Sequence, residues 1–250
     1  MGVELNHLLR VARISLKERG AMETLKQGPA YLITHVRRRM AWRTLEREDG
    51  FDEKYGTDTT TILGPGDFGS TSENLGHAVL YLPTLPRTLK RIISVMNIPY
   101  EDFVFIDFGS GKGRTLLIAS EFPFKRIIGV ELSPRLHAIA QKNIQIYRSE
   151  TQKCNNFELE CVDATSYALP IEKTVFYFFD PFKLPVMSVV LENIRQSLEK
   201  QPRKIFIAYV HPTHSNLMDQ SGFLECVYFS KGGPPEDQPE HPWVIYTNSL

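Results

Sequence analysis

Runs of apolar residues recur at regular intervals through the second half of the chain and predict a β-sheet. From residue 102 onward, seven segments have the composition of strands: FVFIDF, RIIGVE, FELECVD, VFYFFD, KIFIAYV, FLECVYFS and WVIYTN. The first five are separated mostly by helical segments. Their continuous β-branched and aromatic residues are typical of strands that are buried on both faces. Alternating strands and helices predict a parallel sheet with helices on both sides.

The last two strand-like segments should pair differently from the others. Only KGGPPEDQPEHP separates them, which is too short and too rich in proline for a crossover helix. We therefore expect an antiparallel hairpin at this end of the chain. The predicted fold class is α/β, a Rossmann-like, doubly wound, seven-stranded and mostly parallel sheet with an antiparallel C-terminal hairpin and an N-terminal helical extension.

The N-terminal part of the chain follows other patterns. Apolar residues at positions 5, 8, 9, 12 and 16 predict an amphipathic helix over the first twenty residues, and a second helix is expected from about residue 30 to residue 48. Residues 50–76 are rich in Gly, Thr and Asp without a sustained period, which predicts a long loop that acts as a lid or a linker. We therefore divide the chain into residues 1–76, helical segment and lid loop, and residues 77–250, the sheet domain. A helix is also expected from about Pro83 to Met96.

Charge and cysteine content narrow the function classes. The formal net charge of the 250 residues is zero, which argues against nucleic acid as a partner. Residues 1–50 hold ten Lys and Arg against six Asp and Glu, so the predicted second helix, with its run Arg37–Arg39, either has a solvated basic face or makes a peripheral contact with a membrane or an acidic partner. Cys154, Cys161 and Cys226 lack the spacing of a disulfide framework or a zinc site.

The same features predict where the protein resides. No apolar run approaches the length of a membrane span, and charges interrupt the apolar residues near the N-terminus too early for a signal peptide. We therefore expect a cytoplasmic protein without a metal centre.

A glycine-rich turn in the stretch VFIDFGSGKGRTLLIAS is the first candidate for chemistry. A phosphate-binding P-loop requires glycine and a hydroxyl residue where this chain has Ile106 and Gly113. The dinucleotide fingerprint requires glycine or alanine where this chain has Arg114. The stretch instead reads D-x-G-x-G-x-G, between a predicted strand and a predicted helix. Such a turn presents backbone N–H groups and a helix N-terminus to a compact zwitterion or carboxylate.

Two acidic residues follow at the ends of the next two predicted strands. Glu131 lies 22 residues after Gly109, where a carboxylate can accept hydrogen bonds from both hydroxyls of a ribose. Ser133 and Pro134 then predict the start of a helix. Asp163 lies just past the third strand, where it can accept from an adenine amino group. All three features fall at the carboxyl ends of successive parallel strands, the edge where open α/β sheets bind ligands.

On these residues, the stretch from about residue 80 to the C-terminus resembles class I S-adenosylmethionine-dependent methyltransferases. YLPT, residues 81–84, is similar to the segment that closes over the cofactor in non-SET histone-lysine and ATP-synthase lysine methyltransferases. The resemblance implies S-adenosylmethionine as cofactor, with the methionine end on the glycine turn, the ribose on Glu131 and the adenine on Asp163 and Ala164. The implied cofactor-binding residues are Tyr81, Thr84, Asp107, Gly109, Ser110, Gly111, Gly113, Glu131, Leu132, Asp163 and Ala164.

The methyl acceptor should lie beyond the fourth strand, at Asp180-Pro181-Phe182. An acidic side chain and an outward-facing carbonyl can accept from an amine, and an aromatic ring can pack beside it. The triplet resembles the [DN]-P-P-[YF] motif of amino-group methyltransferases, except that the second proline is missing. In the alternative interpretation Asp180 caps a turn, Pro181 ends the strand and Phe182 belongs to the core. His211 and His214 lie at the same edge, and Tyr55 is expected to reach the cleft from the predicted lid.

We therefore expect a methyltransferase that acts on an amine nitrogen, with protein lysine as the leading acceptor. A small metabolite or a nucleic-acid base remains the alternative acceptor, because substrate selection in this fold lies in loops and N-terminal additions. A non-catalytic protein that binds an adenosyl ligand or a nucleotide is the alternative from another class. A dehydrogenase is a third interpretation, against which Arg114 counts.

Overall fold

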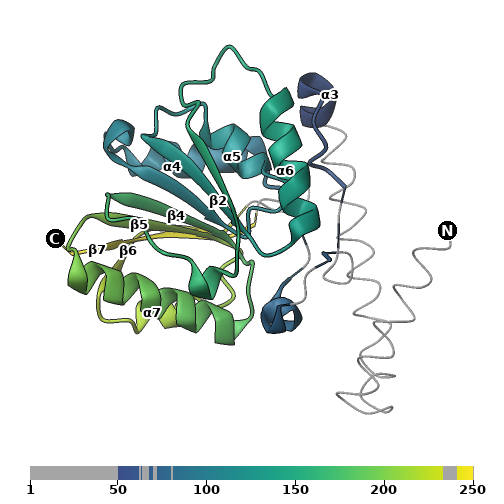
Figure 1. Cartoon of the computed structure of the whole chain (residues 1–250). Helices are drawn as coiled ribbons and strands as arrows, with labels where there is room; N and C mark the ends of the chain where they lie inside the picture. The colour runs from purple at the N-terminus through teal and green to yellow at the C-terminus, as the bar shows by residue number, and fades with distance from the viewer. Residues whose placement is uncertain are drawn as a thin grey trace. The chain divides into compact units, whose positions relative to one another are not determined.

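A seven-stranded sheet lies at the centre of the described chain, with strand order β3-β2-β1-β4-β5-β7-β6 (Figure 1). The first five strands are parallel to their neighbours, and β7 is antiparallel to both β5 and β6. The predicted α/β class, with a mostly parallel seven-stranded sheet and a C-terminal hairpin, is therefore confirmed. The strands are β1 (Val104–Phe108), β2 (Arg126–Glu131), β3 (Phe157–Cys161), β4 (Thr174–Phe179), β5 (Ile205–Val210), β6 (Leu224–Ser230) and β7 (Trp243–Asn248).

This computed structural model describes residues 50–61, 63, 68–69, 72–79, 81–232 and 241–249. The two predicted N-terminal helices lie outside these residues, and the part from Phe51 onward forms one compact unit. Its helices are α3 (Phe51–Tyr55), α4 (Pro86–Met96), α5 (Arg114–Ala119), α6 (Pro134–Ile146), α7 (Leu184–Lys200) and α8 (Ser215–Asp219), with short 3-10 turns η2 (Glu73–His77), η3 (Tyr100–Asp102) and η4 (Ala164–Ser166). Among the described residues, no helix is both long enough and apolar enough to cross a membrane.

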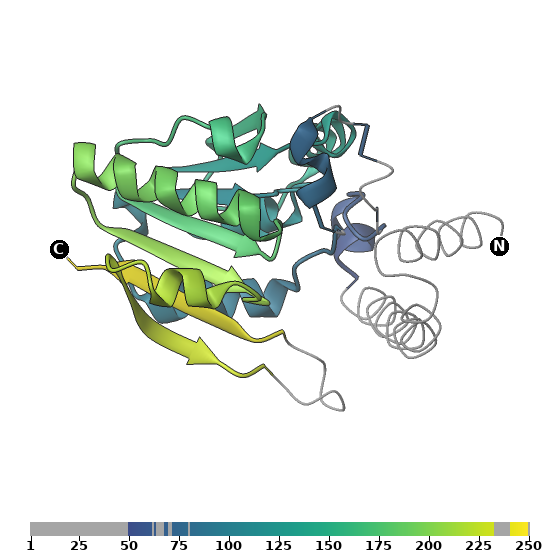
Figure 2. The same ribbon diagram turned by 90° about the horizontal axis from the view of Figure 1, so that it is seen from below.

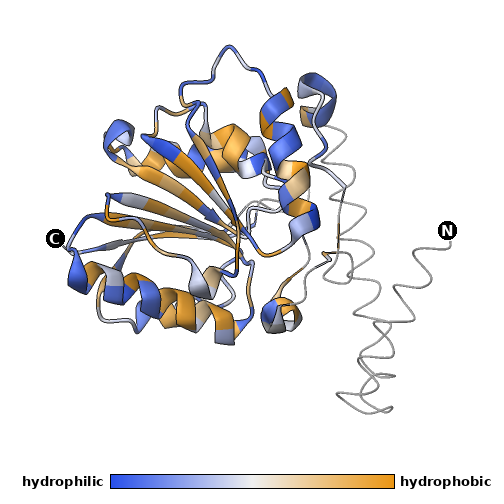
Figure 3. Cartoon of the chain, viewed as in Figure 1, coloured by the Kyte–Doolittle hydropathy of each residue, from blue (hydrophilic) through white to orange (hydrophobic). Residues whose placement is uncertain are grey.

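Alternate side chains of each central strand pack on opposite faces of the sheet. Phe105 and Tyr177 join one core cluster with α4 and α5, whereas Ile106 and Phe178 join a second cluster with α7. The central strands are accordingly hydrophobic over most of their length (Figure 3). β1 and β4 are buried almost throughout, as the continuous apolar runs predict. β3 and β6 are more exposed because they form the two edges of the sheet, and Figure 2 shows β6 at one of them.

The strand order reverses direction at β1, which lies between β2 and β4. The chain leaves β1 toward β2 on one side, and it enters β4 on the other side. In open α/β sheets a crevice forms at the carboxyl ends of the strands at such a point. The turns that follow β1, β2 and β4 therefore meet in one place.

The segment before the sheet is more structured than its sequence indicates. Residues 50–76 were expected to form a loop, yet α3 and part of η2 fall within them. α3 forms because Phe51 is buried in the core beside α4 and α5, and because the Asp52 carboxylate binds the residues that follow the helix. The helix expected from about Pro83 begins at Pro86, a proline at its first turn, where the missing N–H costs nothing.

Candidate functional site

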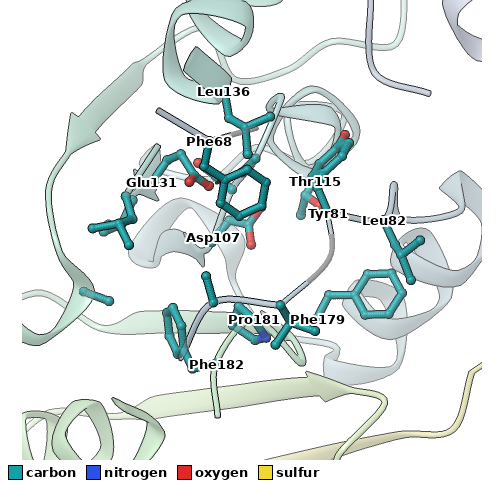
Figure 4. A pocket seen from close by; sticks show the side chains of 18 of the residues that line it. Phe68, Tyr81, Leu82, Asp107, Thr115, Glu131, Leu136, Phe179, Pro181 and Phe182 are labelled. Atoms are coloured by element: carbon teal, nitrogen blue, oxygen red, sulfur yellow. Dashed lines mark hydrogen bonds between the residues drawn. The ribbon is translucent and has the colours of Figure 1, made fainter. Parts of the chain in front are cut away.

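A pocket lies at the carboxyl ends of β1, β2 and β4 (Figure 4). It brings together the turn after β1, the ends of β2 and β3, the turn after β4, and residues 78–79 and 81–84, which precede α4. Its lining includes most of the positions expected from the sequence: Tyr81, Thr84, Asp107, Gly109, Ser110, Gly111, Glu131, Leu132, Asp163, Ala164, Pro181 and Phe182. Gly113 and Asp180 are not among the lining residues.

The glycine turn after β1 requires glycine for two reasons. Gly109 and Gly111 have φ angles of +79° and +54°, in the left-handed region that residues with a Cβ avoid. A Cβ on Gly109 would also lie 2.6 Å from Cβ of Pro181, and one on Gly111 would lie 2.2 Å from the Tyr81 ring. The turn is thus enclosed by Pro181 on one side and Tyr81 on the other, which leaves its backbone as the floor of the pocket.

Asp107, the acidic residue of β1, lies at the floor of the pocket. Its side chain is 3% exposed, and burial raises its pKa to about 8, against a hydrogen bond from Thr115 that lowers it. Thr115 Oγ1 also lies 3.1 Å from Thr84 Oγ1, and Thr84 Oγ1 lies 3.0 Å from the Tyr177 hydroxyl. A buried polar network therefore surrounds Asp107. A cation placed beside this carboxylate would stabilise its charged form.

Glu131 ends β2 and faces the same pocket. Its Oε2 accepts from the backbone N–H of Gly111 at 2.7 Å, and its Oε1 accepts from the N–H of Ser133 at 2.8 Å. Burial raises the pKa of Glu131, while hydrogen bonds from the backbone N–H groups of Ser133, Gly111 and Leu132 act in the opposite direction. A carboxylate offers about four lone-pair sites, so acceptor capacity remains for a ligand. Ser133 caps α6 through its hydroxyl and Pro134 occupies the first turn, as the sequence predicts.

Asp163 lies at the end of β3, and protein groups surround its carboxylate. Oδ2 accepts from the Ser72 hydroxyl and from Asn74 Nδ2, each at 2.9 Å. Oδ1 accepts from the backbone N–H of Thr165 at 3.0 Å and from its hydroxyl at 2.7 Å. Although burial alone would raise the pKa of Asp163, these hydrogen bonds lower it. The carboxylate therefore fixes residues 72–74 beside the pocket, while the adjacent Ala164 contributes to its wall.

The turn after β4 presents Pro181 and Phe182 to the pocket, whereas Asp180 points elsewhere. Asp180 Oδ1 accepts from the hydroxyls of Tyr209, at 3.1 Å, and Thr213, and Oδ2 lies 3.1 Å from His211 Nδ1. All three partners belong to the end of β5 and the loop after it. Asp180 and His211 both have positive φ angles, of 40° and 52°.

The other side of this turn contacts residues before α4. Ala78 and Phe182 form an isolated antiparallel bridge, and the backbone N–H of Lys183 donates to the carbonyl of His77 at 2.9 Å. The position of Pro181 and Phe182 is therefore fixed from both sides.

Three further residues singled out in the sequence lie outside the pocket lining. His211 pairs with Asp180 and packs against His241, with ring centroids 5.1 Å apart. His214 precedes α8. Tyr55 packs against Phe51 and Tyr147.

Several pocket residues were not expected from the sequence. Phe68 is buried, its carbonyl accepts from the Ser133 hydroxyl, and Figure 4 shows its ring among Leu136, Glu131 and Asp107. Asn74, Val79 and Leu82 also line the pocket. Asn74 and Val79 carry no motif of their own and lie in the aperiodic stretch before the sheet, whereas Leu82 belongs to the stretch YLPT, of which only Tyr81 and Thr84 were expected to bind the cofactor. Only the length of that stretch and its Gly and Asp content indicated a functional loop.

The residues of the pocket fit S-adenosylmethionine. A buried carboxylate at Asp107 suits the ammonium group of the methionine end. The backbone N–H groups of the glycine turn were expected to face the ligand, but those of Gly109, Ser110, Gly111 and Gly113 donate within the protein, to Val130, Glu131 and Ser110. Glu131 retains lone pairs for the ribose hydroxyls, and Leu136, Val162 and Ala164 supply apolar walls for an aromatic base. Among the described residues, no group of three or more His, Cys, Asp or Glu side chains is arranged to hold a metal ion.

Comparison with known proteins finds a family match over part of this chain. Residues 74–165 match the family described as histone methylation protein DOT1. A protein-lysine N-methyltransferase of Saccharolobus islandicus (strain REY15A) is 30% identical over 92 residues, which cover 35% of this chain and 56% of the relative. The chain thus matches little more than half the length of this curated relative.

The fold resembles that of a solved methyltransferase structure. A glycopeptide N-methyltransferase in complex with S-adenosylmethionine superposes with a TM-score of 0.50 and 8% identity, covering 68% of this chain and 96% of that one. A magnesium protoporphyrin IX methyltransferase from Synechocystis PCC 6803 with bound cofactor gives a TM-score of 0.48 and 10% identity, covering 66% and 79% of the two chains. This chain therefore has the fold of class I S-adenosylmethionine-dependent methyltransferases, and its residues 74–165 carry the sequence pattern of the DOT1 family.

Proposed function

We propose that this protein is an S-adenosylmethionine-dependent methyltransferase that methylates an amine nitrogen, with the side chain of a protein lysine as the acceptor. The observation that carries this proposal is the contact between Gly109 and Pro181, which joins the glycine turn to the turn after β4 within one pocket. The family description names histone methylation, and the Saccharolobus relative is named a protein-lysine methyltransferase. Both names support lysine as the acceptor.

Different residues of the pocket have different roles in the proposed reaction. When bound, S-adenosylmethionine supplies an electrophilic methyl group on a sulfonium. Asp107 and the glycine turn hold the methionine end, Glu131 holds the ribose, and the wall that includes Ala164 receives the adenine. Pro181 and Phe182 border the acceptor side, where they exclude water and align the incoming nitrogen. Alignment in a dry site supplies most of the rate enhancement available to such a displacement.

A labelled-methyl experiment tests the proposal. The full chain is incubated with methyl-tritiated S-adenosylmethionine and a heat-treated cell lysate, and the protein fraction is hydrolysed and separated by chromatography. The proposal predicts label in ε-N-methyllysine, with loss of that label for Glu131→Gln and retention for Glu160→Gln, an exposed glutamate of β3. Label confined to small molecules or nucleic acid would overturn the acceptor. Cofactor binding without any transfer would support the non-catalytic interpretation.

A further inference from the structure

Residues 51–61, FDEKYGTDTTT, precede the segment that matches the DOT1 family, and the cofactor motifs do not account for them. We propose that Asp52 and Asp58 are positioning residues of the cofactor site. Asp52 folds a turn that holds Tyr81 over Gly111, and Asp58 neutralises Lys112 within the glycine turn. This inference rests on the proposed function, because it concerns the same pocket.

Asp52 organises the turn that follows α3. Its Oδ1 accepts from the hydroxyls of Thr57 and Thr59, each at 2.7 Å. Its Oδ2 accepts from the backbone N–H groups of Thr59 and Thr60, at 2.7 Å and 2.8 Å. Although burial alone would raise the pKa of Asp52, these four hydrogen bonds lower it. A single carboxylate therefore fixes residues 57–60.

The turn fixed by Asp52 holds Tyr81 in place. The Tyr81 hydroxyl donates to the carbonyl of Thr59 at 2.8 Å, and its backbone N–H donates to the carbonyl of Leu63 at 3.0 Å. Thr59 itself is fully buried. The Tyr81 ring lines the pocket and lies so close to Gly111 that a Cβ there would be 2.2 Å from it. Contacts through Thr59 and Tyr81 thus connect Asp52 to the glycine turn.

Asp58 contacts the glycine turn directly, through an ion pair with Lys112. Lys112 Nζ lies 2.7 Å from Asp58 Oδ1, and the side chain of Lys112 is 1% exposed whereas that of Asp58 is 58% exposed. A buried ammonium that loses its counter-ion carries a large desolvation cost. The charge of Lys112 is therefore directed at the segment before the sheet, and Lys112 is not among the residues that line the pocket.

Asn143 of α6 joins the two segments at the backbone. Its Oδ1 accepts from the N–H of Asp58, and its Nδ2 donates to the carbonyls of Asp58 and Lys112, each at 2.9 Å. The neighbouring Arg114 is also buried, and its guanidinium lies 4.6 Å from the centroid of the Phe51 ring. Both basic residues of the sequence GKGR thus contact the segment that begins at Phe51. The geometry implies that the segment and the glycine turn order each other.

The test compares cofactor affinity with stability in conservative variants. Asp58→Asn removes the charge opposite Lys112 but keeps the backbone groups that bind Asn143, and Asp52→Asn weakens the turn at residues 57–60. Tyr81→Phe keeps the ring over Gly111 and removes the hydroxyl. The matched control is Asp102→Asn, which breaks an exposed ion pair with Lys173 of 2.9 Å far from the pocket. Dissociation constants for S-adenosylhomocysteine are measured by calorimetry, and Tm by scanning calorimetry.

We expect Asp52→Asn and Asp58→Asn each to weaken S-adenosylhomocysteine binding by about tenfold, which is about 1.4 kcal/mol. Asp102→Asn should bind as the wild type does, and Asp58→Glu should recover part of the loss. In a Tyr81→Phe background, Asp52→Asn should weaken S-adenosylhomocysteine binding by less than it does in the wild type. Both substitutions act through the contact between the Tyr81 hydroxyl and Thr59. Wild-type affinity in folded Asp52→Asn and Asp58→Asn would overturn the inference. The inference would also be overturned if the loss of affinity simply followed the loss of Tm in every variant, the control included.

A ligand-independent measurement separates this inference from the proposed function. Amide hydrogen exchange in the absence of ligand should be faster at residues 109–115 in Asp58→Asn than in the wild type or Asp102→Asn. Absence of S-adenosylhomocysteine binding by the wild type would overturn the proposed function and the cofactor role together. Unchanged exchange at these residues would show that Asp58 does not order the glycine turn, whatever the ligand.

Discussion

Pro181 lies directly against Gly109, so that the turn after β4 touches the turn after β1. A Cβ on Gly109 would be 2.6 Å from Cβ of Pro181. The two turns come from adjacent parallel strands. The turn after β1 borders the proposed cofactor side of the pocket, and the turn after β4 borders the proposed acceptor side. Their contact sets how closely the acceptor side of the pocket approaches the cofactor side.

Gly109→Ala should therefore destabilise the protein and weaken cofactor binding. The new methyl group meets Pro181, and the φ angle of +79° is unfavourable for alanine, so we expect a loss of about 2–4 kcal/mol in the free energy of unfolding. Gly222→Ala is a matched control, because Gly222 has a φ of +74° but no atom within 4 Å of its would-be Cβ. Urea unfolding of both variants provides the measurement. Equal losses in the two would show that contact with Pro181 contributes nothing.

Cofactor affinity should increase with pH because of Asp107. Burial raises the pKa of this carboxyl to about 8, so the ligand-free protein holds it mostly protonated at neutral pH. A bound ammonium group favours the ionised form, so binding releases a proton and strengthens as the pH rises from about 6 to about 8. Calorimetric titrations with S-adenosylhomocysteine across this range measure the effect. Asp107→Asn should bind more weakly and without this pH dependence; a wild type with constant affinity would contradict the prediction.

Replacement of Asp180 should act mainly on the turn after β4. Its carboxylate accepts from Tyr209 and Thr213 and pairs with His211, and its side chain is 15% exposed. We expect Asp180→Ala to lower the free energy of unfolding by about 1–3 kcal/mol, because the buried Tyr209 loses the acceptor of its hydroxyl. Asp180→Asn should lose less, and both variants should still bind S-adenosylhomocysteine. Wild-type stability of Asp180→Ala together with complete loss of methyl transfer would instead indicate direct contact with the acceptor.

Asp163→Ala should loosen the segment that precedes α4. The carboxylate binds Ser72 and Asn74, and Asn74 lines the pocket. We expect faster proteolysis within residues 72–79 and weaker cofactor binding, since one wall of the pocket is no longer fixed. Ser72→Ala combined with Asn74→Ala, which leaves Asp163 in place, should reproduce the effect. If that double variant binds as the wild type does while Asp163→Ala loses affinity, Asp163 contacts the ligand directly.

The sheet and the centre of the pocket follow from local sequence patterns. Continuous apolar runs predict buried strands, and the short proline-rich connection before β7 predicts the hairpin; both are confirmed. The positions of Asp107, Glu131 and Asp163 follow because carboxyl ends of adjacent parallel strands meet at one edge of the sheet. These predictions need only the strand boundaries and the polarity of the residues that follow them.

The contacts of the segment before the sheet could not be predicted in the same way. Asp58 is 54 positions from Lys112 and 85 from Asn143, so their pairing depends on the completed fold. The direction of the Asp180 side chain depends likewise on the loop after β5, 29 to 33 residues later. The sequence suggested a lid from residue 50 onward, but its short helix depends on burial of Phe51 in a distant core.

Calorimetric titration of the wild type and of Glu131→Gln with S-adenosylmethionine and S-adenosylhomocysteine would show whether this pocket binds the proposed cofactor. We expect micromolar binding of both ligands by the wild type, and much weaker binding by Glu131→Gln, whose amide has one acceptor oxygen where the carboxylate has two. A folded wild-type protein that binds neither ligand would contradict the account, because the pocket built from Asp107, Glu131 and the glycine turn would then serve some other purpose.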